Sequence, residues 1–156
     1  MNYVACEQFM DFCDEMMIAE EGVVTKDFDV FGKMEYKHGW TKFQDITFFK
    51  KPYKIRISAQ AYSGKDITPE QQKSYSKFIK NENKYINIIG SKIKEYIDEN
   101  IDEPVSDVSS LIEPKTLLFK DNGDVIMLFD CKWDIEHGFA VQIIPKIAMG
   151  VQDLFL

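Results

Sequence analysis

The pair Asn122-Gly123 constrains the fold most, because it joins two apolar segments that have the composition of strands. Residues 116–120 precede the pair, and residues 125–133 follow it. Asn-Gly favours a two-residue type I′ turn, since both residues tolerate a positive φ. We therefore predict a β-hairpin here, followed by strands at 139–144 and 147–155 that are broken at Pro145-Lys146 and at Gly150. The C-terminal third is predicted to be a β-meander.

A second hairpin is predicted upstream of this one. Apolar residues alternate with polar residues from Tyr53 to Ala61, which is typical of a half-buried strand. Residues 40–44 and 46–49 have the pattern of two short extended pieces that precede it. Pro52 fixes φ near the value that a turn needs, so we expect the chain to reverse at residues 50–52.

Between the two hairpins lies the clearest helix start in the chain. Thr68 can cap a free amide, Pro69 suits the first helical position, and Gln71 can complete a capping box. Isoleucines and aromatic residues then recur at helical spacing as far as Asn100. The polar residues 81–83 favour a break, so residues 69–100 are predicted to form one long or, preferably, two consecutive helices.

Two further segments complete the prediction of the fold. Residues 3–20 have apolar positions at helical spacing, which predicts an N-terminal helix. Residues 101–114 are acidic and are predicted to be a connector with one helical turn at 108–111. The length of 156 residues fits one domain. The predicted fold class is α+β: a single domain, residues 1–156, in which an antiparallel sheet (hairpin plus C-terminal meander) packs against the helices.

Charge and composition exclude several classes of function. The net charge is −7, whereas nucleic-acid binding needs a basic surface. Arg56 is the only arginine, so bidentate phosphate clamps are nearly absent. No apolar run approaches the ~20 residues of a membrane helix, and the N-terminus lacks the pattern of a signal peptide. Three cysteines without a framework indicate reduced thiols, and we expect a cytoplasmic protein.

Chemistry is most plausible in the segment 130–138, at the end of the predicted return strand. If Asp130, Asp134, Glu136 and His137 converged, they could hold a metal or perform general acid–base catalysis. The alternative is a solvated turn, because an aspartate in a turn bonds its own backbone and the adjacent Glu136 and His137 point apart in extended chain. This second interpretation is favoured, so neither a metal nor a cofactor is expected.

Structural roles are predicted for other residues of the same region. Trp133 follows Met127, Phe129 and Cys131 on one face of the predicted strand, so we expect it to anchor the core. On the sequence alone, Trp133→Ala should destabilise the fold by about 3–5 kcal/mol. Structural positions are also predicted for two glycines, Gly138 and Gly150.

Two short motifs resemble a known family. They are Trp133-Asp134-x-Glu136-x-Gly138 and Gly150-x-Gln152-Asp153, and they resemble the closing motif of an uncharacterised bacterial domain family. Earlier in the chain, Ile67, Thr68 and Gln71 open a helix that carries an aromatic pair, as family members do. The resemblance spans about Trp40 to Leu156. It implies a cytoplasmic bacterial protein without an established activity, and some relatives resemble immunity proteins that neutralise a toxin.

Three hypotheses follow. The first is a non-enzymatic protein-binding domain of the immunity type, which binds a basic protein such as a toxin through acidic complementarity. Its candidate contact residues are Asp130, Asp134, Glu136, His137 and Asp153. The second is a small metal-dependent or hydrolytic enzyme that uses Asp130, Asp134, Glu136 and His137. The third is a domain that assembles only with itself. No nucleic acid or membrane is expected as a partner.

Overall fold

The computed structural model describes residues 17–18, 24–62, 65–101 and 107–156. The strands of this part of the chain form one nine-stranded sheet, whose spatial order follows the sequence. They are β1 (Met17–Ile18), β2 (Val24–Phe28), β3 (Gly32–Tyr36), β4 (Trp40–Phe48), β5 (Lys51–Ala59), β6 (Ile112–Phe119), β7 (Val125–Cys131), β8 (Phe139–Ile144) and β9 (Ala148–Gly150). Strands β5 and β6 are parallel, and every other neighbouring pair is antiparallel.

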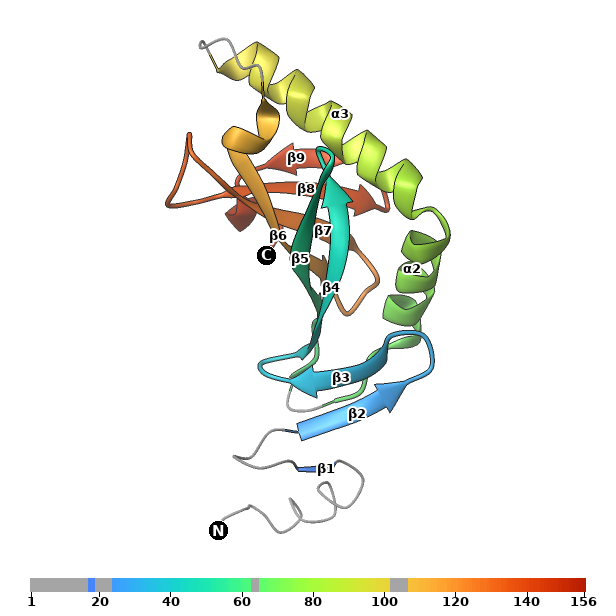
Figure 1. Cartoon of the computed structure of the whole chain (residues 1–156). Coiled ribbons are helices and arrows are strands. Elements are labelled where there is room, and N and C mark those ends of the chain that lie inside the picture. Colours follow the sequence, from blue (N-terminus) through green and yellow to red (C-terminus); the bar gives the residue numbers. More distant parts are fainter. Residues whose placement is uncertain (1–16, 19–23, 63–64, 102–106) are drawn as a thin grey trace.

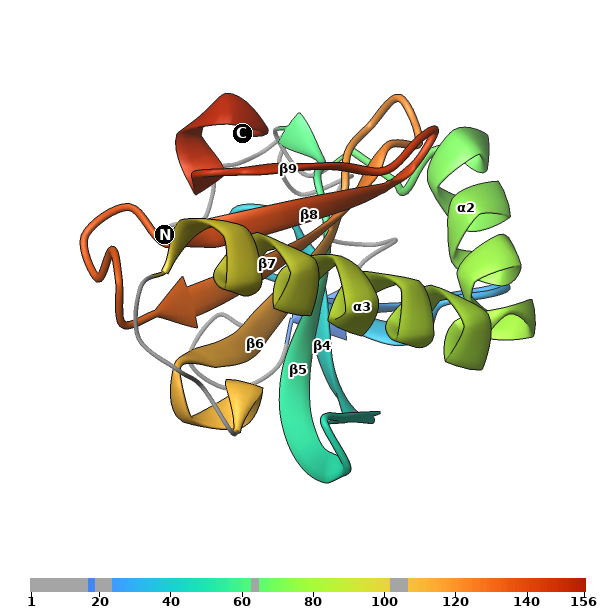
Figure 2. The same cartoon turned by 90° about the horizontal axis from the view of Figure 1, so that it is seen from above.

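The helices form the connection between the two parallel strands. Parallel neighbours need a long crossover, and here α2 (Pro69–Lys80) and α3 (Glu82–Asn100) supply it. A short 3₁₀ turn, η3 (Val108–Ser110), then leads into β6. Figures 1 and 2 show both helices on the same side of the twisted sheet, with α3 running across it and α2 at one end. The break that was predicted at residues 81–83 is confirmed at Asn81.

The main core lies between the helices and one face of the sheet. The alternating positions Ile55, Ile57 and Ala59 are fully buried there, as the pattern predicts. Helix α3 contributes Ile89 and Ile93 from its apolar stripe. Burying this stripe against the sheet is the main source of stability for a helix of this kind.

The opposite face of the sheet is covered over only part of its area. Leu118, Ile126 and Ala140 are buried on that face of β6, β7 and β8. The chain end passes beside these strands through a second 3₁₀ turn, η4 (Gln152–Leu154), and Lys120 Nζ donates a hydrogen bond of 2.7 Å to the Phe155 carbonyl. Figure 2 shows this end of the chain on the side of β9 away from α3.

The capping box of α2 is present and also ties the helix to the sheet. Thr68 Oγ1 accepts from the Gln71 backbone at 3.1 Å, and Gln71 Oε1 accepts from the Thr68 backbone at 2.8 Å. The Gln71 amide is fully buried, and its Nε2 donates to the carbonyls of Gln60 and Phe119. These carbonyls lie at the ends of β5 and β6, so one side chain joins the helix start to the parallel strand pair.

The predicted fold class is wrong. The chain has one mixed, predominantly β sheet, rather than the predicted antiparallel hairpin plus meander packed against one long or two consecutive helices, with an N-terminal helix. The error arose because strand alternation reveals strands but not their neighbours, and the parallel pairing of Arg56 with Thr116 joins the two predicted halves. The predicted helix at 3–20 lies outside the described residues, except for Met17–Ile18, which form β1.

The predicted turns are also corrected. Asn122 does not have a positive φ, and the β6–β7 connection is a longer loop in which Gly123 alone has a positive φ, at 97°. Two consecutive positive φ values, as in a type I′ turn, occur instead at Phe49 and Lys50 between β4 and β5. Pro52 lies within β5 rather than in a turn. Residues 40–48 form one continuous strand instead of two pieces.

The predicted hairpin at 116–133 is confirmed as the antiparallel pair β6–β7, although both ends differ. Strand β6 begins at Ile112, inside the predicted connector, and β7 ends at Cys131. The predicted helical turn at 108–111 is confirmed as η3. Beyond β8, the predicted strand 147–155 is short, because the chain turns into η4 after Gly150.

Candidate functional site

The turn after β7 is organised by the side chain of Asp134. Its Oδ1 accepts a hydrogen bond of 3.1 Å from the His137 backbone and lies 2.9 Å from His137 Nδ1. Its carbonyl accepts from the Gly138 backbone at 2.9 Å, and the Cys131 thiol lies 3.6 Å from the same carbonyl oxygen. Asp134 thus acts on its own backbone, as an aspartate commonly does in a turn.

The two short motifs of the sequence meet in space. Gln152, from the second motif, donates through Nε2 to the Phe129 carbonyl at 2.9 Å. Gly138, from the first motif, leaves the space that this amide occupies, because a Cβ there would lie 2.5 Å from Gln152 Nε2. At Gly150, a Cβ would lie 2.9 Å from Leu154 Cδ1. The motif residues therefore hold the turn 134–138 in contact with the C-terminal turn η4.

Trp133 lies partly buried at the edge of the core. Its ring centroid is 5.9 Å from that of Tyr96 on α3 and 5.6 Å from that of Phe139 on β8. It thereby links the turn to the helix and to the next strand. The tryptophan that is fully buried is Trp40, whose indole N–H donates to the Lys65 carbonyl at 2.7 Å.

The carboxylates near the turn do not converge on His137. Of Asp130, Asp134 and Glu136, only Asp134 contacts the histidine. In the part of the chain that the structure describes, Asp130 and Glu136 form no ion pair or side-chain hydrogen bond, and no group of three or more His, Cys, Asp or Glu side chains is placed to hold a metal ion. The arrangement that the enzyme hypothesis needs is therefore not assembled by these four side chains.

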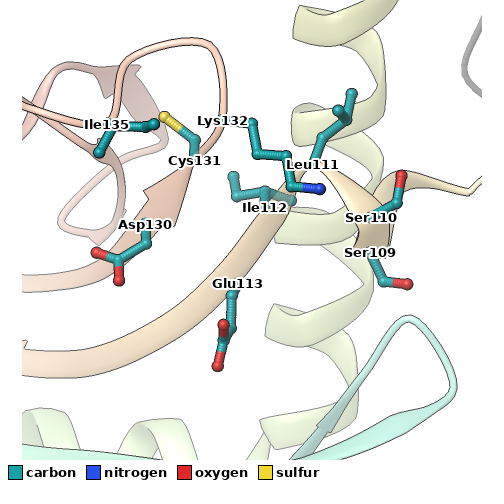
Figure 3. Close-up of a pocket in the computed structure, with 9 residues that line it drawn as sticks. All are labelled: Ser109, Ser110, Leu111, Ile112, Glu113, Asp130, Cys131, Lys132 and Ile135. Atoms are coloured by element: carbon teal, nitrogen blue, oxygen red, sulfur yellow. The ribbon is translucent and has the colours of Figure 1, made fainter.

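An open cavity of about 520 Å³ lies beside the turn, between η3, the start of β6 and the end of β7. Its lining includes Ser109, Ile112, Glu113, Asp130, Lys132 and Ile135. Figure 3 shows the carboxylates of Glu113 and Asp130 directed toward the same side, away from Leu111. Their Cα atoms are register partners on β6 and β7, and like charges directly opposite one another repel.

Two groups at or near this cavity have raised pKa values, in each case chiefly through burial and secondarily through nearby carboxylates. The pKa of Tyr53 is raised, first by burial and then by the charges of Glu113 and Asp107. The pKa of the Cys131 thiol is raised chiefly by burial, with further increases from the charges of Asp134 and Asp130. The Cys131 thiol is therefore protonated near neutral pH, which makes it a poor nucleophile.

The pKa of the Asp134 carboxyl is lowered, first by the hydrogen bond from the His137 side chain and then by the His137 backbone N–H. Because the pKa is lower in the folded chain than in the unfolded chain, this group stabilises the fold fully above its unfolded pKa. The contribution is lost as the pH falls through the folded pKa.

We therefore expect Asp134→Asn to flatten the acid dependence of stability. Between about pH 5 and pH 2, the melting temperature of the variant should fall less than that of the wild type. Thermal unfolding followed by circular dichroism at several pH values measures this. Glu136→Gln, in the same turn, is the control, because Glu136 forms no side-chain hydrogen bond in the described structure. An unchanged acid dependence in Asp134→Asn would contradict the role of its hydrogen bonds.

Sequence reasoning missed two exposed residues of this region. Ile135 is 85% exposed, although it is a large apolar side chain, and Leu154 in η4 is 72% exposed. An isoleucine inside an otherwise polar turn was a usable signal. Glu113 was assigned to a connector, and its position opposite Asp130 required the strand register.

The fold and the site together define a mixed β-sheet protein with a two-helix crossover, an open cavity lined by Glu113, Asp130 and Lys132, and a turn at the end of β7 that Gln152 holds in place. A family model for a domain of unknown function, DUF6985, matches residues 30–155, so the chain belongs to that family. No curated protein and no solved structure gives a significant match. Among the described residues, neither helix is long and apolar enough to cross a membrane.

Proposed function

We propose that this chain is a non-enzymatic, cytoplasmic protein-binding domain of the immunity type from a bacterium. It would bind and neutralise a basic protein, such as a toxin, through the acidic surface around the turn 134–138. The proposed contact residues are Asp130, Asp134, Glu136, His137 and Asp153. The following observations support this proposal.

The observation that carries the proposal is the exposure of Ile135 in an acidic setting. Asp134 and Glu136 flank it in sequence, and Asp130 lines the same cavity. Exposed apolar side chains that gather within a polar rim mark interaction sites, whereas single ones are common on any surface, so Ile135 supports the proposal together with the exposed Leu154 of η4. The apolar side chain would supply contact area, and the carboxylates would select a basic partner.

The second turn extends this surface. The hydrogen bond from Gln152 to the Phe129 carbonyl fixes η4 near the turn 134–138, and η4 carries the exposed Leu154 beside Asp153. Asp130, Glu136 and Asp153 form no ion pair with a described residue, so their charge is available to a partner. The net charge of −7 would also steer a basic protein toward the chain.

A binding measurement with the toxin candidate encoded by the adjacent gene tests the proposal. We expect binding at micromolar concentration or tighter, and Asp130→Lys/Glu136→Lys should weaken it by about tenfold or more. Ile135→Ala should also weaken binding without lowering the melting temperature, because the side chain is exposed. Isothermal titration calorimetry measures the affinity of each variant, at low and at high salt, and thermal unfolding measures the melting temperature.

Asp27→Lys/Asp29→Lys is the matched control, because it changes the net charge by the same amount and both are exposed carboxylates in and just after β2, near the other end of the sheet order from β7. It should leave the affinity unchanged. If the adjacent gene encodes no toxic protein, or if its product fails to bind at micromolar concentration, the proposed function is wrong. Equal weakening by the control and by Asp130→Lys/Glu136→Lys would show that only the net charge matters.

A further inference from the structure

The face of β4 and β5 opposite the helices carries a basic and aromatic patch, which we define as Phe43, Lys54 and Arg56. Phe43 and Arg56 are register partners, and Phe43 is 54% exposed. The Lys54 Nζ lies 5.0 Å and the Arg56 Cζ lies 5.5 Å from the centre of the Phe43 ring. Both cations therefore stack on an aromatic ring that remains open to solvent.

These two cations lack a carboxylate partner within the described part of the chain. Lys54 is the register partner of Asp45 but forms no ion pair with it, and Arg56 forms none with any described residue. In contrast, Lys26, Lys51 and Lys115 each pair with a carboxylate. The chain carries more acidic than basic residues, so two cations without a carboxylate partner beside one ring form a surface that can bind a negatively charged group.

The same face also carries the complementary charge. Arg56 is paired in register with Thr116, and Thr116 with Leu128, which places Leu128 on this face of β7. Asp130 lies two residues further along, on the same face, and Glu113 is its register partner on β6. The face thus presents cations on β5 beside carboxylates on β4, β6 and β7, and Glu113 also forms an exposed ion pair of 3.1 Å with Lys115.

We propose that this face binds a second copy of the chain and forms a two-fold symmetric dimer. A two-fold contact uses the same surface on both subunits, so it needs a surface that complements itself. Lys54 and Arg56 of one copy would meet Glu113 and Asp130 of the other, and symmetry would repeat the contact. Phe43 would contribute aromatic contact area, as aromatic and arginine residues do at the centres of interfaces.

The first measurement is the oligomeric state of the wild-type chain. Sedimentation velocity from about 1 to about 500 µM, at low salt, should show a monomer–dimer equilibrium, and raising the salt should shift it toward monomer. A wild-type chain that stays monomeric over this range would overturn the proposal. The basic and aromatic patch would then be expected to bind an acidic segment of another protein instead.

Charge reversal locates the interface. Lys54→Glu/Arg56→Glu makes both halves of the face acidic, and Glu113→Lys/Asp130→Lys makes both halves basic. Each variant alone should be monomeric, with a dimer dissociation constant raised by about tenfold or more, because like charges then face each other. An equimolar mixture of the two should form a heterodimer, since every contact again joins opposite charges.

The control is Lys73→Glu/Lys77→Glu on the exposed side of α2, which changes the net charge as much as the first variant. This control should dimerise like the wild type. All reversed residues are exposed, so circular dichroism should show that every variant remains folded. A wild-type dimer that survives both reversals, or a mixture that remains monomeric, would overturn the proposal.

Asp130 belongs both to this face and to the proposed partner-contact residues, so a basic partner would compete with the dimer. The sedimentation experiment contains no partner. Its result is therefore independent of the proposed function, and either idea can fail while the other stands.

Discussion

Trp40→Ala is expected to lower the free energy of unfolding by about 3–5 kcal/mol, which is the usual loss when a large buried aromatic is truncated. Trp40 is fully buried, and its ring lies against Phe28 and Tyr36, with centroids 5.1 Å away in both cases. Truncation would leave a large cavity between β2, β3 and β4. It would also remove the donor of the hydrogen bond to the Lys65 carbonyl. Urea denaturation followed by fluorescence or circular dichroism measures the loss.

Trp133→Ala is the matched comparison, because it removes the same side chain from a partly buried position. We expect a smaller loss there, since solvent can fill much of the space and the Trp133 ring, tilted on Tyr96 and edge-on to Phe139, is only partly buried. The two variants should be measured in the same buffer. Equal losses would contradict the assignment of Trp40 as the central anchor of the β2–β4 region.

The sequence supported the local elements better than their assembly. Thr68, Pro69 and Gln71 predicted the start of α2 correctly, because a capping box depends on residues only a few positions apart. The alternation of Ile55 and Ile57 likewise identified the buried face of β5. Such signals are local, so no knowledge of the partner strands was needed.

Assembly depended on contacts that the sequence does not encode locally. The pairing of β5 with β6 joins residues that are separated by two helices, and nothing in either strand specifies a parallel neighbour. The turn at Phe49 and Lys50 shows the same limit. Positive φ values are unfavourable for both residues, so tertiary packing overrides a local preference that had pointed to Asn122-Gly123.

The candidate site shows a similar division. The sequence placed Asp134 in a turn that bonds its own backbone, which matches its hydrogen bonds to His137. The pairing of Glu113 with Asp130 and the patch at Phe43 could not be found, because both depend on the register between strands. The 85% exposure of Ile135, by contrast, had a local signal, because an isoleucine within an otherwise polar turn has few ways to reach the core.

Gly138→Ala is expected to be the most damaging single-methyl change in the C-terminal region. Gly138 has φ of +67°, where an L side chain is strained. A Cβ would also lie 2.9 Å from the Phe129 carbonyl oxygen and 2.5 Å from Gln152 Nε2. The Gln152 side chain could move, but only by giving up its hydrogen bond to that carbonyl, and the backbone oxygen belongs to the buried strand β7. We expect a loss of about 3–5 kcal/mol in the free energy of unfolding, measured by urea denaturation.

Gly32→Ala separates the two causes of this loss. Gly32 has a similar φ of +78°, but no atom lies within 4 Å of the position that its Cβ would occupy. Gly32→Ala should therefore lower the free energy of unfolding only by the strain of an L residue at positive φ, about 1–2 kcal/mol. The difference between the two variants measures the cost of displacing the C-terminal turn from the turn 134–138. If Gly138→Ala were no more destabilising than Gly32→Ala, the two motifs would not be locked by contact, and their packing at Gln152 would contribute little to the fold.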